Sequence, residues 1–131
     1  MKKLLTCLAL FTFLATAESF AQVAAKPQAA ANSRKLTEEQ KINHLIKYVA
    51  GLEGASFIRN GDSYSAKDAA EHLQMKRRKA GDRVKTARDF IDGLASESYL
   101  SGKAYQIKLK DGKVYNSRDV LMKELTRIER L

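Results

Sequence analysis

The sequence predicts a small, mainly helical α+β domain in which two tight hairpins separate the helices, in the order α-ββ-α-α-ββ-α. Two pairs, Asn60-Gly61 and Asp111-Gly112, lie between short runs of strand-forming residues, and such pairs mark hairpin turns. Between and around these hairpins, apolar residues recur at the three- and four-residue spacing of amphipathic helices. The alternation of the two patterns indicates the fold class.

The first helix is expected to begin just after Leu36. Thr37 and Gln40 have the spacing of a capping box, in which each side chain bonds the other residue's backbone N–H. Gly51 is placed to end the helix. The buried stripe between these signals is expected to consist of Ile42, Leu45, Ile46 and Val49.

The first hairpin is expected over residues 57–64. Asn-Gly tolerates the positive φ of a two-residue type I′ turn. That turn sets Arg59 opposite Asp62 and Phe57 opposite Tyr64, a charge pair and an aromatic pair across the ladder. The two pairs support the same register.

Two cap patterns predict the next helices. Ser65 with Asp68 begins a helix that ends near Gly81 and uses Ala66, Ala69, Ala70 and Leu73. Thr86 with Asp89 begins a third helix, followed by a serine-rich loop. Its apolar face is expected to hold Ala87, Phe90, Ile91, Leu94 and Ala95.

The C-terminal part is expected to form the second hairpin and the last helix. Tyr105, Ile107 and Leu109 alternate with polar residues as in a half-buried strand, and the chain returns through Val114 and Tyr115. The final helix is expected to start at residue 116 or 117. One side of it should carry Leu121, Leu125, Ile128 and Leu131.

Residues 1–21 have the pattern of a secretory signal peptide. Two lysines precede the apolar run 4–14, and small residues allow cleavage after Ala17 or Ala21. The run is shorter than the roughly 20 apolar residues of a membrane-spanning helix. We therefore expect a periplasmic or secreted protein with no transmembrane segment after signal removal.

The expected mature chain has two parts. Residues 22–35 are alanine-rich and read as a flexible spacer, and residues 36–131 form one domain. The only cysteine, Cys7, lies in the apolar run and is lost on cleavage, which leaves no thiol for a disulfide. A lipid-modified cysteine is the alternative for Cys7.

The chain carries a formal charge of +9. In the cell envelope a basic surface favours anionic partners, such as phosphorylated lipids, acidic polysaccharides or acidic proteins. Nucleic acid is not the expected partner, because tryptophan is absent and no strand interleaves basic and aromatic residues. We expect a monomer without cofactor or metal.

Seven basic residues and one acid, Asp82, fall in residues 76–88, which we call the basic junction. These cations could offset the dipole of the second helix and otherwise form a solvated face. Alternatively they bind an anion, together with the free N–H groups at the start of the third helix. The anion-binding candidates are Lys76, Arg77, Arg78, Arg83, Lys85 and Arg88.

His72 and Tyr64 are the other candidates. His72 follows Asp68 by four residues, so on a helix an acid and an imidazole share one face, as in catalytic and metal-binding pairs. A histidine bonded at the edge of the core is the alternative. Tyr64 belongs to a set of tyrosines that could form a stacking platform or part of the core. No nucleophile can be placed.

Residues 57–105 contain a dense run of short motifs. These are FIRNG (57–61), YSA (64–66), AAEHL (69–73), RVKTA (83–87), DFI (89–91) and SGK (101–103). With these motifs the chain resembles an uncharacterised family of small exported bacterial proteins that share a domain of unknown function. The resemblance implies a shared fold and export, and brings no known reaction, cofactor or partner.

Three functions remain open. The first is a non-enzymatic module that binds an anionic envelope component or an acidic protein surface through the basic junction. The second is an envelope hydrolase that uses His72. The third is a structural or inhibitor protein that acts through its hairpin tips.

Overall fold

The computed structural model describes residues 35–131. The expected signal peptide (residues 1–21) and residues 22–34 of the expected spacer lie outside the described residues. The described part is an α+β domain in the expected order. Its elements are α1 (Glu38–Ala50), β1 (Ser56–Arg59), β2 (Asp62–Ser65), α2 (Ala66–Ala80), the short helix η1 (Gly81–Arg83), α3 (Ala87–Phe90), the π-helical turn η2 (Ile91–Ala95), β3 (Gln106–Lys108), β4 (Val114–Asn116) and α4 (Ser117–Ile128).

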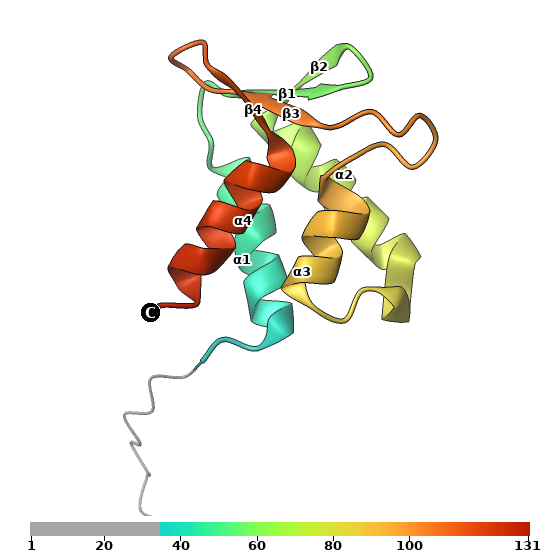
Figure 1. Ribbon diagram of the computed structural model, residues 1–131, viewed down its shortest axis with the longest axis vertical. Helices are drawn as coiled ribbons and strands as arrows, with labels where there is room; N and C mark the ends of the chain where they lie inside the picture. The colour runs from blue at the N-terminus through green and yellow to red at the C-terminus, as the bar shows by residue number, and fades with distance from the viewer. Residues whose placement is uncertain (1–34) are drawn as a thin grey trace, which may run out of the picture. The chain divides into compact units, whose positions relative to one another are not determined.

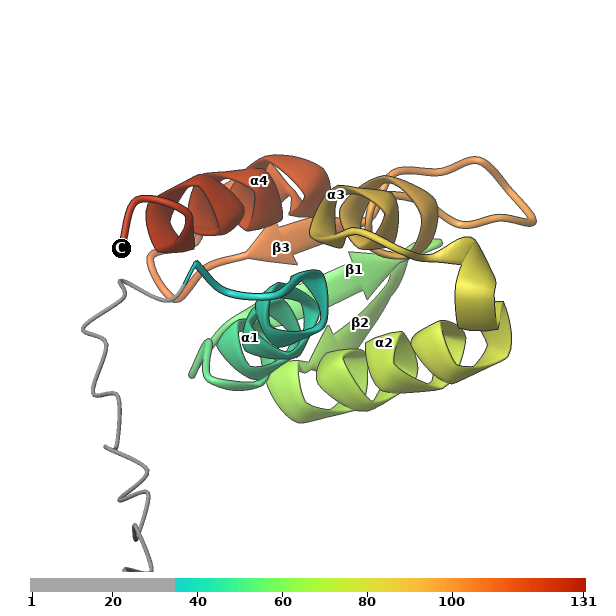
Figure 2. The same cartoon turned by 90° about the horizontal axis from the view of Figure 1, so that it is seen from below.

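The four strands form one antiparallel sheet in the order β2-β1-β3-β4. Figures 1 and 2 show the helices gathered on one face of this sheet. The expected register of the first hairpin is confirmed, with Phe57 opposite Tyr64 and Arg59 opposite Asp62. Side chains paired across a ladder share a face, so Tyr64, Phe57, Ile107 and Tyr115 form one row toward the helices.

The core lies between the sheet and the helices. The predicted stripe of α1 is buried, and Phe90 and Ile91 are fully enclosed beneath it. From the sheet, Ile107 is fully buried and Phe57 nearly so. Burial of side chains of this size contributes about 1.5–3 kcal/mol each, which makes this layer the main source of stability.

Local signals place the helix starts. Thr37 and Gln40 form the expected capping box at α1, and Ser65 accepts a hydrogen bond from the Asp68 N–H at α2. Helix α1 ends at Ala50, just before Gly51, and α2 ends just before Gly81. The caps work as expected because each needs only residues within four positions along the chain.

The two hairpins turn differently. Asn60 and Gly61 have φ values of 53° and 92°, as the predicted type I′ turn requires. In the second hairpin only Gly112 has positive φ, at 85°, and the Leu109 N–H donates to the Lys113 carbonyl. The second turn is therefore a three-residue loop with glycine in the left-handed position, not a two-residue turn.

The third helix differs most from expectation. Thr86 and Asp89 form a capping box, but the α-helix covers only Ala87–Phe90 and continues as the π-helical turn η2. Widened turns leave carbonyls that need other donors. The Ser96 hydroxyl donates to the Ile91 carbonyl at 2.6 Å. Lys76 Nζ, from α2, donates to the Leu94 carbonyl at 2.6 Å.

Helix α4 buries Leu121, Leu125 and Ile128 as expected. The expectation that Leu131 continues this stripe is wrong, because the helix ends at Ile128 and the Leu131 side chain is 82% exposed. Among the helices of residues 35–131, none combines the length and the apolar character that a membrane crossing requires.

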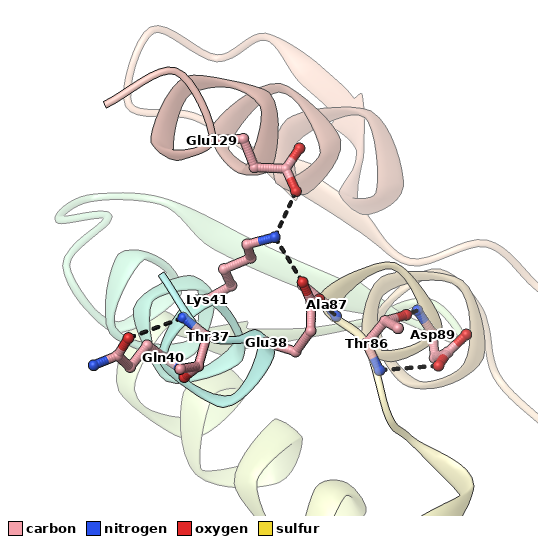
Figure 3. A network of polar contacts seen from close by, with 8 residues as sticks. All are labelled: Thr37, Glu38, Gln40, Lys41, Thr86, Ala87, Asp89 and Glu129. Atoms are coloured by element: carbon pink, nitrogen blue, oxygen red, sulfur yellow. Dashed lines mark hydrogen bonds and ion pairs between the residues drawn. The ribbon is translucent and has the colours of Figure 1, made fainter. Parts of the chain in front are cut away.

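A buried cation joins three helices. Lys41 of α1 is 4% exposed, and its Nζ lies 2.6 Å from a Glu38 oxygen and 2.8 Å from a Glu129 oxygen. The other Glu38 oxygen accepts the Ala87 N–H at the start of α3 (Figure 3). The ammonium thus ties α1 to the end of α4 and, through Glu38, to α3.

Candidate functional site

A pocket of about 670 Å³ lies between α2 and the sheet, and we call it the α2 pocket. Its size is typical of sites for small ligands. The lining is largely apolar, with polar groups at its edges. The apolar part includes Phe57, Leu73, Met75 and Ala95, and the polar part includes Arg59, Tyr64, His72 and Arg78.

Arg59 lies at the centre of the polar edge. It shares a sheet face with Phe57, so its side chain projects toward α2. There the guanidinium lies 4.9 Å from the centre of the Tyr64 ring, and Nη2 is 3.3 Å from the Tyr64 hydroxyl. Nη1 lies 2.5 Å from His72 Nε2. Arg59 stands opposite Asp62 in the ladder as expected, but among the described residues no ion pair joins the two side chains.

The surroundings of His72 favour its neutral form. Burial, followed by the nearby charges of Arg59, Lys76 and Lys79, lowers the pKa of His72 below its ordinary value. Both ring nitrogens lie within 3.1 Å of Arg59 Nη1. A guanidinium only donates hydrogen bonds, so the ring nitrogen that accepts from it must be the one without a proton. The structure therefore presents a neutral imidazole between a cationic side chain and an apolar pocket.

Asp68 is not the partner of His72. Its carboxylate accepts the Ser65 hydroxyl at 2.7 Å, as part of the cap of α2. The helical spacing does place both side chains on the pocket lining, together with Glu71. The pair expected from the sequence thus shares a face without the contact that would orient the imidazole.

The charged groups of α2 are ordered along the pocket. Asp68 and Glu71 lie near the start of the helix, and Arg78 lies near its end. Asp68 is bonded to Ser65, and Glu71 has Lys67 at 4.0 Å. Within residues 35–131 no hydrogen bond or ion pair forms on the Arg78 side chain. The cationic end of the pocket therefore has an available guanidinium.

Two cations of the basic junction serve the fold. Lys76 donates to the Leu94 carbonyl and to the Tyr105 hydroxyl, and its Nζ lies 5.0 Å from the centre of the Tyr105 ring. Arg83 folds back onto the carbonyls of Lys79 and Ala80, where it caps the end of α2. These two side chains are already engaged by backbone and ring acceptors.

The remaining cations of the junction point to different places. Arg77 bonds Asn43 and lies 3.6 Å from Glu39, both on α1. Lys85 and Arg88 are exposed, and their side chains have no ion pair among residues 35–131. Arg78 is the one candidate of the six that lines the α2 pocket. The structure thus brings Arg78 together with Tyr64 and His72.

The start of α3 is occupied by the protein's own carboxylates. Glu38 accepts the Ala87 N–H at 2.8 Å, and Asp89 accepts the N–H groups of Lys85 and Thr86. Hydrogen bonds from Thr86 lower the pKa of Asp89, which keeps the carboxylate ionised. An anion at this helix start would have to displace these groups. The anion site across the basic junction stays a prediction. The N–H groups of Lys85, Thr86 and Ala87 already donate to carboxylates and would not be vacant donors for it.

Arg59 is the residue that the sequence did not single out as a candidate. The period-two pattern of β1, which puts it on the same face as Phe57, is the signal that could have done so. Within residues 35–131 no three side chains of the metal-binding types come together. His44 instead bonds Glu124 of α4 at 2.6 Å, and it is not among the residues that line the α2 pocket.

Residues 36–129 match the model of a family described as "Family of unknown function (DUF5329)". The chain belongs to this family. A relative described as "Uncharacterized protein YfeK", from Salmonella typhimurium, is 38% identical over 68 residues. That match covers 52% of the chain and 57% of the relative's length. No solved structure matches the chain.

Proposed function

We propose that this family member is an exported, non-enzymatic binding module of the cell envelope, and that its α2 pocket receives an amphipathic anion. The carrying observation is the combination of an apolar lining with Arg78 at one end of the pocket, whose side chain forms no hydrogen bond or ion pair within residues 35–131. The periplasmic or secreted location is part of this proposal. It rests on the lysines, apolar run and small residues within residues 1–21.

The apolar part of the ligand would lie against Phe57, Leu73 and Met75. Phe57 and Leu73 are buried at 8% and 6% exposure, whereas Met75 is 39% exposed. A methionine at a pocket mouth adapts to different shapes because its side chain is unbranched and flexible. The lining therefore favours a ligand with an extended or ring-shaped hydrocarbon body over a small inorganic ion.

The anionic group would lie toward Arg78. The acids of the lining, Asp68 and Glu71, are at the other end of α2 and repel an anion there. Arg59 adds positive potential from the sheet, although two of its nitrogens already contact Tyr64 and His72. The charge order along the pocket thus gives the ligand one favoured orientation.

The test uses two fluorescent probes of similar shape. Anilinonaphthalene sulfonate carries an anion and phenylnaphthylamine carries none. We expect Arg78→Gln to weaken binding of the sulfonate about tenfold, the value of one charged hydrogen bond, and to leave the neutral probe unchanged. Arg88→Gln removes an exposed cation outside the pocket and is the matched control. Equal effects of both substitutions, or none, would contradict the proposed site.

The hydrolase remains a second candidate because the pocket lining contains both the Tyr64 hydroxyl and the His72 imidazole, whose pKa is lowered. A neutral histidine is the form a general base requires. Against it, both ring nitrogens of His72 lie within 3.1 Å of Arg59 Nη1, and no hydroxyl of residues 35–131 bonds either one. Hydrolysis of chromogenic esters or phosphates that is lost in His72→Gln would favour the enzyme. A hydrolysis rate no higher than that in buffer alone would exclude an esterase or phosphatase activity on these substrates.

A further inference from the structure

Two large apolar side chains stand almost fully exposed at the tip of the loop between η2 and β3. Tyr99 is 95% exposed and Leu100 is 94% exposed. They are flanked by Ser98, Ser101 and Gly102, so the tip carries no charge over residues 98–102. Figure 1 shows this loop projecting beyond the end of the sheet. We call residues 98–102 the loop tip.

The loop tip is held in place by hydrogen bonds. The Ser98 N–H donates to the Lys103 carbonyl, and the Gly102 N–H donates to the Ser98 carbonyl at 2.7 Å. Below the tip, Glu97 and Ala104 form a β-bridge. The Ser101 hydroxyl donates to Asn60 at 2.6 Å, which fixes the tip against the β1–β2 turn. The exposed pair is therefore preorganised, and docking it costs little further ordering.

We propose that the loop tip inserts into the interface of a lipid bilayer that contains anionic lipids. Tyrosine suits the headgroup region because its ring is apolar and its hydroxyl is polar. Leu100 supplies a hydrocarbon group, and the backbone bonds of the tip reduce the polar groups that need water. Lys103, exposed directly after the tip, lies where an anionic headgroup would be.

The small size of the tip favours a bilayer over a protein partner. One aromatic side chain buries about 150–250 Å². A specific protein interface buries about 800 Å² on each partner, far more than two side chains provide. A bilayer needs no complementary shape, and the basic chain, with a formal charge of +8 once Lys2, Lys3 and Glu18 are lost with residues 1–21, is attracted to an anionic surface.

Docking at this point would bring the α2 pocket to the membrane. The loop leaves the domain at Ala95 and returns at Tyr105, and both residues line the pocket. The turn that supports the tip, at Asn60, follows Arg59 of the pocket edge. The inference rests on the exposure and order of the tip, and it holds whichever ligand the pocket takes.

The test places a reporter at the tip of the full chain, which has no tryptophan of its own. Leu100→Trp is mixed with vesicles of phosphatidylcholine and phosphatidylglycerol, with and without brominated acyl chains. We expect a blue-shifted emission that the brominated lipid quenches. Leu131→Trp places the reporter at an exposed leucine outside the loop tip and is the matched control. Its emission should show neither the blue shift nor the quenching. The reporter reads the tip itself, so it is independent of the N-terminal residues.

Adding Tyr99→Ser to Leu100→Trp should lower vesicle affinity about tenfold, because burial of one large side chain is lost. Arg78→Gln in the same background should leave the tip signal intact, so a failure of the pocket proposal is separable from a failure here. A tip reporter that stays in water with vesicles, or equal quenching at positions 100 and 131, would overturn the inference. So would a photo-crosslinker at position 100 that labels protein and no lipid in cells.

Discussion

Removal of the buried cation Lys41 is expected to cost less than removal of its acidic partners. The Lys41 side chain is 5% exposed, whereas the Glu38 and Glu129 side chains are 41% and 42% exposed. After Lys41→Met, both carboxylates can hydrate where they stand. After the double substitution Glu38→Gln/Glu129→Gln, the ammonium is left in a dry environment without a counterion. The order of the two costs follows from this difference in exposure.

The magnitudes follow from the geometry. With N···O distances of 2.6 Å and 2.8 Å, the two carboxylates raise the pKa of Lys41 and keep it charged. Breaking a buried pair by removing one partner costs about 3–5 kcal/mol, while an apolar replacement of similar volume is often neutral. We expect the unfolding free energy to fall by about 1 kcal/mol for Lys41→Met and by about 3 kcal/mol for the double glutamine variant. In that double background, Lys41→Met should become stabilising by about 2 kcal/mol.

The assay is urea unfolding at pH 7, followed by far-ultraviolet circular dichroism. Lys47→Met, at an exposed lysine of the same helix, is the matched control and should change the unfolding free energy by less than about 0.5 kcal/mol. Glu38 also accepts the Ala87 N–H, so its substitution weakens a second contact. The change of sign of Lys41→Met between the two backgrounds isolates the charge effect. An equal cost of Lys41→Met in both backgrounds would refute this reasoning.

Three other substitutions test separate parts of the fold. Hydrogen bonds from Arg127 lower the pKa of the buried Glu124, so its contribution to stability is present above its ordinary pKa of 4.5 and is lost as the pH falls through the lower folded value. Glu124→Gln should make the unfolding free energy fall less steeply as the pH is lowered below 4.5. The same pH dependence in the variant and in the unsubstituted protein would exclude this contribution of Glu124. Phe90→Ala empties a fully buried site and should cost about 3–5 kcal/mol in urea unfolding, against less than about 0.5 kcal/mol for Leu131→Ala. Thr37→Ala removes a capping box and should cost about 1 kcal/mol; no shift in the thermal midpoint would show that the cap contributes nothing.

Features set by near neighbours could be predicted from the sequence. The caps at Thr37 and Ser65 and the turn at Asn60 depend on residues within four positions, so local chemistry decides them. The register of β1 and β2 followed from that turn. The buried stripe of α1 followed from its period, because a helix with one apolar face must cover it.

Features set by distant residues could not be predicted. The π-helical turn η2 has its Leu94 carbonyl bonded by Lys76, 18 residues earlier in the chain. Leu131 fits the period of α4, but no element of residues 35–130 covers it once the helix has ended at Ile128. The exposure of Tyr99 gave no sequence signal, since an apolar pair beside a strand is as often buried as exposed.

The candidate site illustrates why a run of charge in a sequence is not a charged surface. Successive residues on a helix point about 100° apart, so Arg77 reaches Asn43 on α1 while Arg78 lies at the α2 pocket. The cations of residues 76–88 are thereby divided among a helix cap, a π-turn carbonyl, α1 and the pocket, with Lys85 and Arg88 in solvent. A ligand that used all of them at once would need to contact several faces. A ligand of the pocket needs only Arg78 and the apolar lining, which is why the pocket, and not the whole junction, is the site to test first.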